Sequence, residues 1–456
     1  MSFTKTIQTA ERIFFVGIGG ISMSSLAHMA LAQGKSVAGS DRAASAATKA
    51  LEAAGAKIVI GHYQKSVQDA DLVVYTAAIG NDSPELCEAK RLGIPTLSRG
   101  EYLGHLMQSY RRRIGISGTH GKTTTTTLLS HIALFADTDP TVMNGALSKT
   151  LDHKAYRIGK DELFLYEACE YKASFHDFYP TTAVITGVEL DHTDFYPDLD
   201  SMIAAFARSL ETADIAIINQ DDEGAKKAAS AFRGKIITFS LKDTADYTAR
   251  DIAFEGGVSY FTLIANGEHY PVTLPLIGSF NIANALAALA AADQNGISLS
   301  VATKALASFE APDRRFNLTY QGDFSLYDDY AHHPSEIKAT LSSARELISG
   351  EGRLITVFQS HTYTRTHDLF DDFKEALSLA DLVYMPDIFA AREVNTVGVS
   401  SKKLCQAIGD KATYIADFEA LADEILRIAR AGDIVITMGA GDVYKIGQRI
   451  KEKLTQ

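Results

Sequence analysis

The sequence predicts an α/β protein made of three α/β units in tandem, the second of which carries a phosphate-binding loop. Its 456 residues correspond to about three domains at roughly 150 residues each. Short β-branched runs alternate with Ala- and Leu-rich stretches, a pattern typical of parallel sheets covered by helices. A glycine-rich turn follows a strand-like run at residues 113–116, and the composition becomes polar near residues 310–313. These two changes mark the expected domain boundaries.

The first unit, expected over residues 1–111, shows the alternation most clearly. Apolar runs predict strands at residues 12–16, 36–39, 57–60 and 72–75. Ala-rich stretches between them predict helices at residues 21–33 and 48–54. Because β-α-β connections join parallel strands, we expect one parallel sheet here.

The central unit, expected over residues 112–312, combines an α/β half with a more irregular half. Strands are predicted at residues 113–116, 163–165, 182–186 and 215–218, and helices at residues 128–135 and 281–293. The Ala-rich composition of the second helix favours helical structure. Residues 235–274 contain strand-like pieces separated by the turn signals Gly256-Gly257 and Asn266-Gly267. They predict a small antiparallel insert.

The C-terminal unit, expected over residues 313–456, alternates again. Strands are predicted at residues 326–329, 353–358, 382–385 and 434–438, and helices at residues 335–347, 369–380 and 418–429. No internal repeat or low-complexity segment interrupts this order. We therefore expect a third α/β domain.

The composition argues against several classes of protein. Forty-four basic and 56 acidic side chains give a formal charge of −12, which disfavours nucleic acid as the main partner because phosphate binding depends on clustered Lys and Arg. The three cysteines, Cys87, Cys169 and Cys405, lie far apart, which suits a reducing compartment. The first eight residues lack a long apolar run, and no segment reaches the ~20 apolar residues of a membrane span. We expect a cytoplasmic protein, monomeric or homodimeric, without a signal peptide.

The strongest functional motif is a glycine-rich turn between a predicted strand and a predicted helix. It consists of Gly118, Thr119, His120, Gly121, Lys122, Thr123 and Thr124. Backbone N–H groups of such a turn surround phosphate oxygens, and the dipole of the following helix favours negative charge. Lys122 suits the β- and γ-phosphates, and the Thr123 hydroxyl suits Mg²⁺. The strict Walker pattern has a glycine where Ile116 stands, so this is a shortened variant; a chance glycine-rich turn is the alternative.

A second glycine-rich turn follows the first predicted strand. It contains Gly17, Gly19 and Gly20, and Asp41 closes the second strand about twenty residues later. This pattern resembles half of a dinucleotide fingerprint, but Ser22 stands at the third glycine position. A phosphate-bearing ligand, an NAD cofactor and a tight turn without a ligand are all compatible with it.

Carboxylates and a histidine follow two strands of the central unit. Glu167 and Glu170 come after one strand, and Glu189, Asp191 and His192 come after the next. Strands that end in acidic groups beside a phosphate loop bring metal ligands to the carboxyl edge of the sheet. Since Mg²⁺ prefers oxygen ligands, His192 is either an unusual ligand or a surface histidine at a strand end.

Two loops of the C-terminal unit carry polar and aromatic residues directly after predicted strands. Their residues of interest are Asp329, Tyr330, His332, His361 and Arg365. Such loops are more often functional than part of a core, with solvated loops as the alternative. Arg315, at the second boundary, either contacts a nucleotide phosphate or belongs to a charged hinge.

Together these motifs resemble the Mur ligase superfamily, the ATP-dependent amide-forming ligases of peptidoglycan precursor synthesis. The resemblance runs through essentially the whole chain, in order. It implies an N-terminal Rossmann-like domain for a UDP-sugar, a central P-loop ATPase domain and a C-terminal Rossmann-like domain for an amino acid. It also implies ATP and Mg²⁺ as cofactors, UDP-N-acetylmuramate and L-alanine as substrates, and a role in cell-wall biogenesis, cell shape and cell division.

The resemblance assigns roles residue by residue. ATP would contact the phosphate loop together with Asn281, Asn284, Arg315 and Asp329. The UDP-sugar turn would comprise Gly17, Gly19, Gly20, Ser22, Met23 and Asp41. Magnesium would bind Thr123, Glu167 and His192. The amino acid would be enclosed by Tyr330, His332, His361 and Arg365, with Arg365 pairing with its carboxylate. The catalytic residues would be Lys122, Glu167, His192 and His332.

Two features indicate the branch of the family. Ligases that add later residues generally carry a carbamylated lysine about fourteen residues after the D-H pair, whereas residues 204–206 read Ala-Ala-Phe. This resembles the alanine-adding branch, as does the loop from His361 to Arg365. A recycling ligase that attaches a whole tripeptide to UDP-N-acetylmuramate is the alternative.

The chain also departs from the family pattern. Cys169 interrupts the common E-A-D sequence, and Ser360 and Thr362 stand where Pro and Arg are common. The missing Arg bears on how strictly alanine is chosen over serine or glycine, because a methyl group distinguishes such substrates by only about 1–3 kcal/mol.

The implied reaction activates a carboxylate with ATP as an acyl phosphate, which an amine then attacks. His332 or His361 would accept the proton of the amine. An NAD-dependent oxidoreductase would leave Lys122 unexplained, and a regulatory protein without activity would have no need of Lys122, Glu167 and His192 together. A folylpolyglutamate or cyanophycin-type ligase shares the phosphate loop but explains the N-terminal turn less well.

Overall fold

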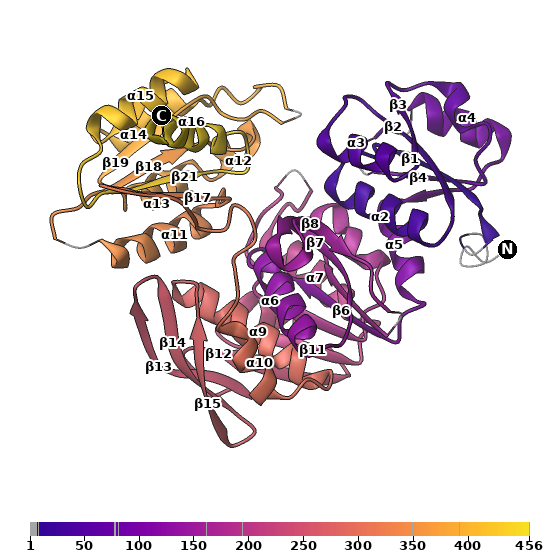
Figure 1. Ribbon diagram of the computed structural model, residues 1–456, viewed down its shortest axis with the longest axis horizontal. Helices are drawn as coiled ribbons and strands as arrows, with labels where there is room; N and C mark the ends of the chain where they lie inside the picture. Colours follow the sequence, from indigo (N-terminus) through magenta and orange to yellow (C-terminus); the bar gives the residue numbers. More distant parts are fainter. Residues whose placement is uncertain are drawn as a thin grey trace.

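In the computed structural model the chain forms three α/β domains, each built around its own sheet (Figure 1). The structure describes residues 7, 9–76, 79–80, 82–160, 162–193, 195–348, 350–391 and 393–455. Most of the N-terminal stretch on which the expectation about a signal peptide depends lies outside these residues. Within them, no helix has both the length and the apolar character needed to cross a bilayer.

The N-terminal domain is a five-stranded parallel sheet with the strand order β3-β2-β1-β4-β5. Its strands are β1 (Arg12–Val16), β2 (Ser36–Asp41), β3 (Lys57–Ile60), β4 (Leu72–Tyr75) and β5 (Thr96–Ser98). Its helices are α2 (Ile21–Ala32), α3 (Ala46–Ala53), α4 (Pro84–Leu92) and α5 (Arg99–Met107), with a 3₁₀ segment η1 (Gln64–Val67). The strand order reverses between β1 and β4, which is where a Rossmann-like sheet binds its ligands. The predicted fold of this domain is confirmed.

The central domain contains a ten-stranded sheet with the order β15-β14-β13-β12-β11-β10-β6-β9-β7-β8. Its first six strands are β6 (Arg112–Ser117), β7 (Thr141–Ser148), β8 (Lys154–Arg157), β9 (Leu163–Glu167), β10 (Thr182–Ile185) and β11 (Ile215–Asn219). β6 pairs in parallel with both β9 and β10. The phosphate loop therefore leaves the sheet between the two strands that precede the predicted carboxylates.

The predicted antiparallel insert is only partly correct, because its residues extend the central sheet. They form β12 (Lys235–Ser240), β13 (Tyr247–Glu255), β14 (Val258–Ala265) and β15 (Glu268–Leu274). β12 pairs in parallel with β11, whereas β13, β14 and β15 form two antiparallel hairpins. The two predicted turn signals lie between the strands of these hairpins.

Helices cover both faces of the central sheet. They are α6 (Lys122–Phe135), α7 (Leu199–Ser209), α8 (Glu223–Ala229), α9 (Ser279–Gln294) and α10 (Leu299–Leu306), with 3₁₀ segments η2 (Lys149–Leu151) and η3 (Tyr171–Asp177). α9 is buried almost all round, because it contacts α6 and α10 on one side and strands β10 to β13 on the other. Its many alanines allow this close approach on every side.

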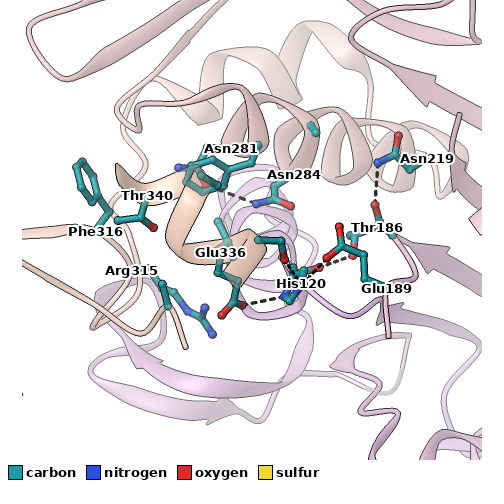
Figure 2. Close-up of a pocket in the computed structure, with 18 of the residues that line it drawn as sticks. His120, Thr186, Glu189, Asn219, Asn281, Asn284, Arg315, Phe316, Glu336 and Thr340 are labelled. Carbon is teal, nitrogen blue, oxygen red and sulfur yellow. Dashed lines mark hydrogen bonds and ion pairs between the residues drawn. The ribbon is translucent and has the colours of Figure 1, made fainter. Parts of the chain in front are cut away.

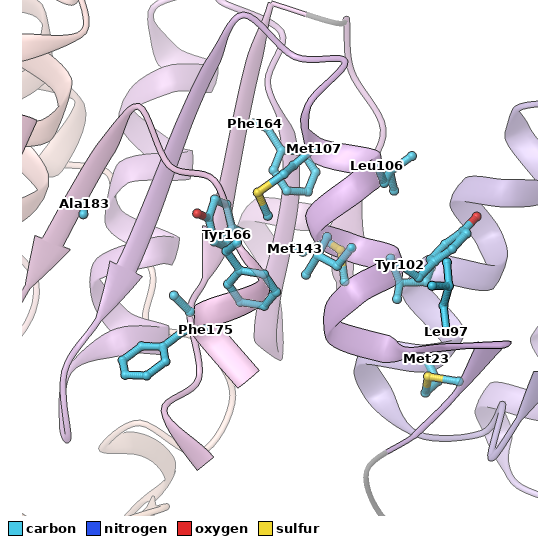
Figure 3. Close-up of a cluster of buried hydrophobic side chains, with 14 of the residues drawn as sticks. Met23, Leu97, Tyr102, Leu106, Met107, Met143, Phe164, Tyr166, Phe175 and Ala183 are labelled. Carbon is cyan, nitrogen blue, oxygen red and sulfur yellow. The ribbon is translucent and has the colours of Figure 1, made fainter. Parts of the chain in front are cut away.

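The N-terminal and central domains share one continuous hydrophobic core (Figure 3). It includes Met23, Leu97, Tyr102, Leu106 and Met107 of the first domain and Met143, Phe164, Tyr166, Phe175 and Ala183 of the second. At this seam α5 approaches η3 so closely that a Cβ at Gly104 would overlap the carbonyl of Asp177. Arg99 also bridges the two domains, donating to Ser22 at 3.1 Å and to Ser174 at 3.2 Å. The shared core holds the first glycine-rich turn in a defined position relative to the central domain.

The C-terminal domain contains a six-stranded sheet with the order β16-β17-β21-β18-β19-β20. Its strands are β16 (Asn317–Gln321), β17 (Ser325–Asp329), β18 (Leu354–Phe358), β19 (Leu382–Met385), β20 (Ala412–Tyr414) and β21 (Ile434–Met438). Its helices are α11 (Pro334–Leu347), α12 (Tyr363–Asp368), α13 (Phe370–Leu377), α14 (Ser401–Ile408), α15 (Phe418–Ile428) and α16 (Tyr444–Thr455). Every strand pair is parallel except β16 with β17. The loops after β17 and β18 therefore leave the same edge of the sheet.

The outer domains lie on two sides of the central one (Figure 1). The C-terminal domain presents the β17–α11 loop and α11 toward the central domain, where Arg315 and Glu336 contact the phosphate loop. We propose domain boundaries after residues 111 and 312, because each of the three sheets then falls within one range.

Candidate active site

The phosphate loop joins β6 to α6 and depends on two glycines. Gly118 has a φ of +134° and Gly121 a φ of +81°, which residues with a side chain rarely adopt. A Cβ at Gly118 would overlap Thr186 Oγ1, and one at Gly121 would overlap Asn284 Oδ1. α6 begins at Lys122, directly after the loop. The free N–H groups and the dipole of its first turn favour an anion there.

Lys122 folds back over this loop. Its Nζ donates to the carbonyls of Gly118 at 2.6 Å and Thr119 at 3.1 Å, and it pairs with the Glu170 carboxylate at 2.9 Å. Burial lowers the pKa of Lys122, but the neighbouring Glu170, Cys169 and Glu167 together raise it more, so the net shift is upward and Lys122 carries its charge. Glu170 is one of the strand-end carboxylates that the sequence indicates as metal ligands. In the structure it pairs with Lys122 instead, a role that its place three residues after Glu167 does not predict.

Thr123 and Glu167 lie together, as the resemblance requires for a magnesium site. Thr123 Oγ1 donates to Glu167 Oε2 at 2.8 Å, and Arg315 of the third domain donates to the same hydroxyl at 3.2 Å. A hydroxyl and a carboxylate are donors that Mg²⁺ prefers, so these two residues fit the ion. His192, expected as a third ligand, faces Glu170 at 3.3 Å from Nε2 to Oε1. His192 therefore contacts the carboxylate that pairs with Lys122, and not the proposed magnesium-binding pair of Thr123 and Glu167.

A cavity of about 320 Å³ lies between the phosphate loop, α9 and the start of α11 (Figure 2). Residues that the sequence analysis assigned to ATP line it: His120, Gly121, Thr124, Asn281, Asn284, Arg315 and Asp329. Further lining residues were not predicted and include Thr186, Asn219, Phe280, Phe316 and Thr340. They come from loops after β10 and β11, from α9 and from the third domain. Because these residues come together only in the folded chain, no contiguous motif in the sequence predicts them.

The cavity combines fixed polar groups with aromatic surface. Asn281 Nδ2 donates to the carbonyl of Ile277 at 2.9 Å, and Asn284 Oδ1 accepts from Thr125 Oγ1 at 3.3 Å. Asp329 accepts from the backbone N–H of Ala331 at 2.7 Å, and burial raises its pKa to about 6. Oriented amides and a carboxylate beside phenylalanine rings suit a flat heteroaromatic ring with polar edges.

A second cavity, of about 500 Å³, lies between the central and C-terminal domains. Its lining includes Tyr171, Asp191, His192, Thr193, His361, Thr362, Thr364, Arg365 and Glu393. The fold thus brings His192 of one domain together with His361 and Arg365 of another. Asp191 was predicted among the strand-end carboxylates beside His192, but not as a neighbour of Arg365, and Glu393 was not predicted.

Arg365 already binds a carboxylate across the domain interface. Its Nη2 and Nε donate to Asp191 Oδ1 at 2.9 and 3.1 Å. Burial raises the pKa of Asp191, but the Arg365 guanidinium and the surrounding histidines together lower it more, so the net pKa lies well below its usual range. Beside this pair, Thr193 Oγ1 donates to Asp368 Oδ2 at 2.7 Å. Arg365 therefore has the carboxylate-binding chemistry that was predicted, with Asp191 as its partner in this conformation.

The two histidines considered as proton acceptors are held neutral. Burial lowers the pKa of His332 to about 3 and that of His361 to about 4. Their ring centroids lie 6.1 Å apart. Tyr330, predicted beside them, lies with its ring 5.1 and 5.0 Å from the guanidinium carbons of Arg314 and Arg315. It therefore lies toward the nucleotide side of its loop.

In the first glycine-rich turn the backbone contacts Asp41, which was predicted to close the second strand. Gly19 N–H donates to Asp41 Oδ2 at 2.8 Å. Gly17 has a φ of +79°, and a Cβ there would lie 2.6 Å from Thr76 Cγ2. The turn is therefore tight, and its aspartate is fixed at the carboxyl edge of the sheet.

The following residues of this turn differ in exposure. Gly20 caps the N-terminus of α2, and Ser22 accepts the hydrogen bond from Arg99. Met23 is only 2% exposed and packs in the core shared with the central domain (Figure 3). Arg99 brings a guanidinium to the turn and was not predicted.

Three family models cover most of the chain. They are described as "Mur ligase family, catalytic domain" over residues 12–111, "Mur ligase middle domain" over residues 116–292 and "Mur ligase, glutamate ligase domain" over residues 314–441.

Full-length relatives agree with these models. A UDP-N-acetylmuramate–L-alanine ligase of Clostridium novyi is 41% identical over 99% of this chain and 100% of its own. One of Acetivibrio thermocellus is 42% identical over 97% of this chain and 96% of its own. Among solved structures, the UDP-N-acetylmuramate–alanine ligase of Thermotoga maritima aligns with a TM-score of 0.82 at 28% identity, covering 97% of this chain and 99% of that one. A murein peptide ligase of Psychrobacter arcticus aligns with a TM-score of 0.71 at 25% identity, covering 97% and 98%.

The fold and the site together define an ATP-dependent ligase of the phosphate-loop type. The chain belongs to the Mur ligase family.

Proposed function

We propose that this chain joins L-alanine to the carboxylate of UDP-N-acetylmuramate with hydrolysis of ATP to ADP and phosphate. The proposal depends above all on one observation: Arg315 of the C-terminal domain reaches Thr123 of the phosphate loop at 3.2 Å. The cavity at the phosphate loop and the cavity at His361 and Arg365 both lie along the interface at which this contact is made. The relatives that match over the full length carry the name of this activity.

We assign ATP to the cavity at the phosphate loop. The adenine ring would lie against Phe280 near Asn281 and Asn284, and the phosphates would lie over Gly121 and Lys122. Thr123 and Glu167 would hold Mg²⁺, which neutralises charge on the phosphate oxygens.

The first chemical step uses the charge of Lys122. A carboxylate oxygen of the sugar substrate attacks the γ-phosphorus of ATP, the bond from that phosphorus to the β-bridging oxygen breaks, and ADP leaves. Lys122 stabilises the negative charge on the transferring phosphoryl group, and Glu170 keeps the lysine aimed at it. The product is an acyl phosphate, which has a good leaving group where the carboxylate had none.

The second step needs a neutral amine. The nitrogen of L-alanine attacks the acyl carbon, and phosphate leaves with the oxygen that bridged carbon and phosphorus. His332 and His361 are both unprotonated near pH 7, since burial holds each pKa at about 3 or 4. We assign His332 as the acceptor of the amine proton, with Arg365 binding the alanine carboxylate in exchange for Asp191.

The experiment is a phosphate-release assay with ATP, Mg²⁺ and UDP-N-acetylmuramate, run separately with L-alanine, L-serine, glycine and the L-Ala-γ-D-Glu-diaminopimelate tripeptide. We expect release with alanine and a product heavier by one alanyl residue. Release with the tripeptide alone would replace the proposal by the recycling reaction. Absence of release with every acceptor would reject the assigned substrates.

A further inference from the structure

The side chain of His120 lies between carboxylates of two different domains, although its backbone belongs to the phosphate loop (Figure 2). Nδ1 lies 3.0 Å from Glu336 Oε1, on α11 of the C-terminal domain. Nε2 lies 3.3 Å from Glu189 Oε2, on the loop after β10 of the central domain. Nε2 also lies 2.9 Å from Ser335 Oγ. Both ring nitrogens therefore face oxygen atoms.

This arrangement favours the imidazolium form. Burial lowers the pKa of His120, but Glu336 and Glu189 raise it more, and the net value is about 10. An imidazolium has no lone pair for a metal ion, since both nitrogens carry protons. The nearby trio of His120, Glu189 and His333 is compact enough to hold a cation, but the charge state of His120 makes it an ion-pair centre.

Glu336 also organises the loop that carries His332. Its Oε2 accepts from the backbone N–H groups of His332 at 3.0 Å and His333 at 3.2 Å, which completes the capping box at the start of α11. The same oxygen lies 3.2 Å from His332 Nδ1. One carboxylate therefore touches both the phosphate loop and the loop with the proposed proton acceptor.

Glu189 is fixed to the phosphate loop independently of the C-terminal domain. Its backbone N–H donates to Thr119 Oγ1 at 2.9 Å, and its carbonyl accepts from the same hydroxyl at 3.0 Å. His120 and Glu189 thus form one rigid unit on the central domain. Glu336 and Ser335 are the parts of the network that arrive with the C-terminal domain.

We infer that His120 and Glu336 are positioning residues that couple docking of the C-terminal domain on the phosphate loop to placement of His332. His120 acts on the reaction through Glu336, which holds the backbone of the His332 loop. This inference rests on the proposed function, because it concerns the placement of His332, to which that function assigns the amine proton.

A double-mutant cycle of His120→Gln and Glu336→Gln tests the inference. Gln at position 336 retains an oxygen for the capping box but no charge. We expect each single variant to lower kcat for amide formation about tenfold, and the double variant to be no slower than the slower single, because one interaction is lost in all three. Because His120 and Glu336 both line the ATP cavity, the affinity for a non-hydrolysable ATP analogue is measured for every variant, and kcat is compared at saturating ATP. Glu375→Gln is the matched control, since Glu375 pairs with Lys338 of α11 on the exposed side at 2.8 Å.

Compactness gives a readout that does not depend on turnover. With ATP analogue and UDP-N-acetylmuramate bound, the wild type and Glu375→Gln should show the same radius of gyration by small-angle scattering. His120→Gln and Glu336→Gln should each show a larger radius of gyration. A double variant whose kcat loss equals the product of the single losses would overturn the coupling, as would unchanged compactness of the variants. An active wild type accompanied by fully active variants would overturn the inference alone. A wild type that releases no phosphate with alanine would overturn the proposed function and the inference with it.

Discussion

At the scale of single residues, the site depends on charges that are paired before any ligand arrives. Lys122 is held by Glu170, Arg365 by Asp191, and His120 by Glu189 and Glu336. Removing one member of such a buried pair leaves the other charge without compensation, which costs several kcal/mol. A variant at these positions therefore changes stability as well as activity, and the two effects need separate measurements.

Lys122→Ala should abolish ATP-dependent phosphate release, to below about one hundredth of the wild-type rate, because the transferring phosphoryl group loses its cation. It should also lower the free energy of unfolding by about 3 kcal/mol, since Glu170 stays buried and charged. Affinity for UDP-N-acetylmuramate should stay near the wild-type value. Steady-state assays, urea unfolding and calorimetry measure the three quantities.

The control separates the two roles of this lysine. Lys122→Met combined with Glu170→Gln removes both charges and should recover much of the stability while activity stays lost. Lys149→Ala, which removes an exposed partner of Glu310, should leave both the stability and the rate of ATP turnover near their wild-type values. Wild-type rates of ATP turnover in Lys122→Ala would refute the assigned role.

The low pKa of His332 sets the pH dependence of the amine step. Burial holds this pKa at about 3, so the ring is already neutral above that pH and its ionisation adds no further limb at higher pH. At saturating ATP, kcat/KM for alanine should rise with pH until the alanine ammonium, with a pKa of about 8 or higher, loses its proton.

His332→Gln should lower this profile by about a hundredfold without moving its midpoint. A separate limb between pH 6 and 7 that disappears in this variant would show that His332 titrates in the normal range for histidine, and would contradict the assignment.

The sequence could predict residues inside contiguous motifs, and it could not predict their partners. Lys122, Thr123 and Glu167 follow strands and turns with recognisable spacing. Glu170, Asp191 and Arg99 lie beside predicted residues but acquire significance only through the atoms that face them. Glu336 was missed because its contact with His120 joins positions 216 residues apart.

At the scale of elements, the turn from β6 to α6 has the strictest requirement for glycine. Gly121→Ala should lower the free energy of unfolding by about 1–2 kcal/mol from the left-handed backbone and further from the overlap with Asn284 Oδ1. Displacing Asn284 should also weaken binding of an ATP analogue. Chemical unfolding and calorimetry measure these effects.

Gly267→Ala provides the matched control. Gly267 has a φ of +78°, close to the +81° of Gly121, but a Cβ there meets no atom within 4 Å. It should therefore show the backbone cost alone and unchanged nucleotide binding. Equal effects of the two substitutions would show that the contact with Asn284 is unimportant.

Helices and strands were predicted correctly where the apolar pattern was strong. The prediction was wrong where the structure depends on pairing between strands distant in the sequence. The helix predicted at residues 281–293 is α9, and the strands around β6 lie where predicted. Local turn signals predict an insert over β12 to β15, whereas no local signal predicts the pairing of β12 with β11. β20 has only three residues, too few for a pattern to be visible, and β16 (Asn317–Gln321) is mostly polar and contains no apolar run.

At the scale of the whole molecule, the two domain interfaces differ in kind. The first and second domains share a hydrophobic core, whereas the third meets the second through ion pairs and hydrogen bonds around two cavities. Polar interfaces of this sort allow relative motion. The sequence predicted the number and class of the domains, but composition alone carries no information about which interface is rigid.

This difference predicts closure of the third domain about the other two. An ATP analogue with UDP-N-acetylmuramate should reduce the radius of gyration of the wild type relative to the free protein. Asp191→Asn should weaken the contact with Arg365 and increase the radius of the free protein, whereas Gly104→Ala should disturb the first interface and mainly lower stability. Scattering curves that are unchanged by both ligands would contradict a mobile third domain.

The most direct test of the central claim follows the oxygen atoms of the sugar carboxylate. UDP-N-acetylmuramate labelled with ¹⁸O in that carboxylate is incubated with ATP, Mg²⁺ and L-alanine, and phosphate and product are analysed by mass spectrometry. The account predicts that one labelled oxygen leaves with the phosphate, and that the product is heavier by one alanyl residue. Phosphate without label, or label transfer without an alanyl product, would contradict it.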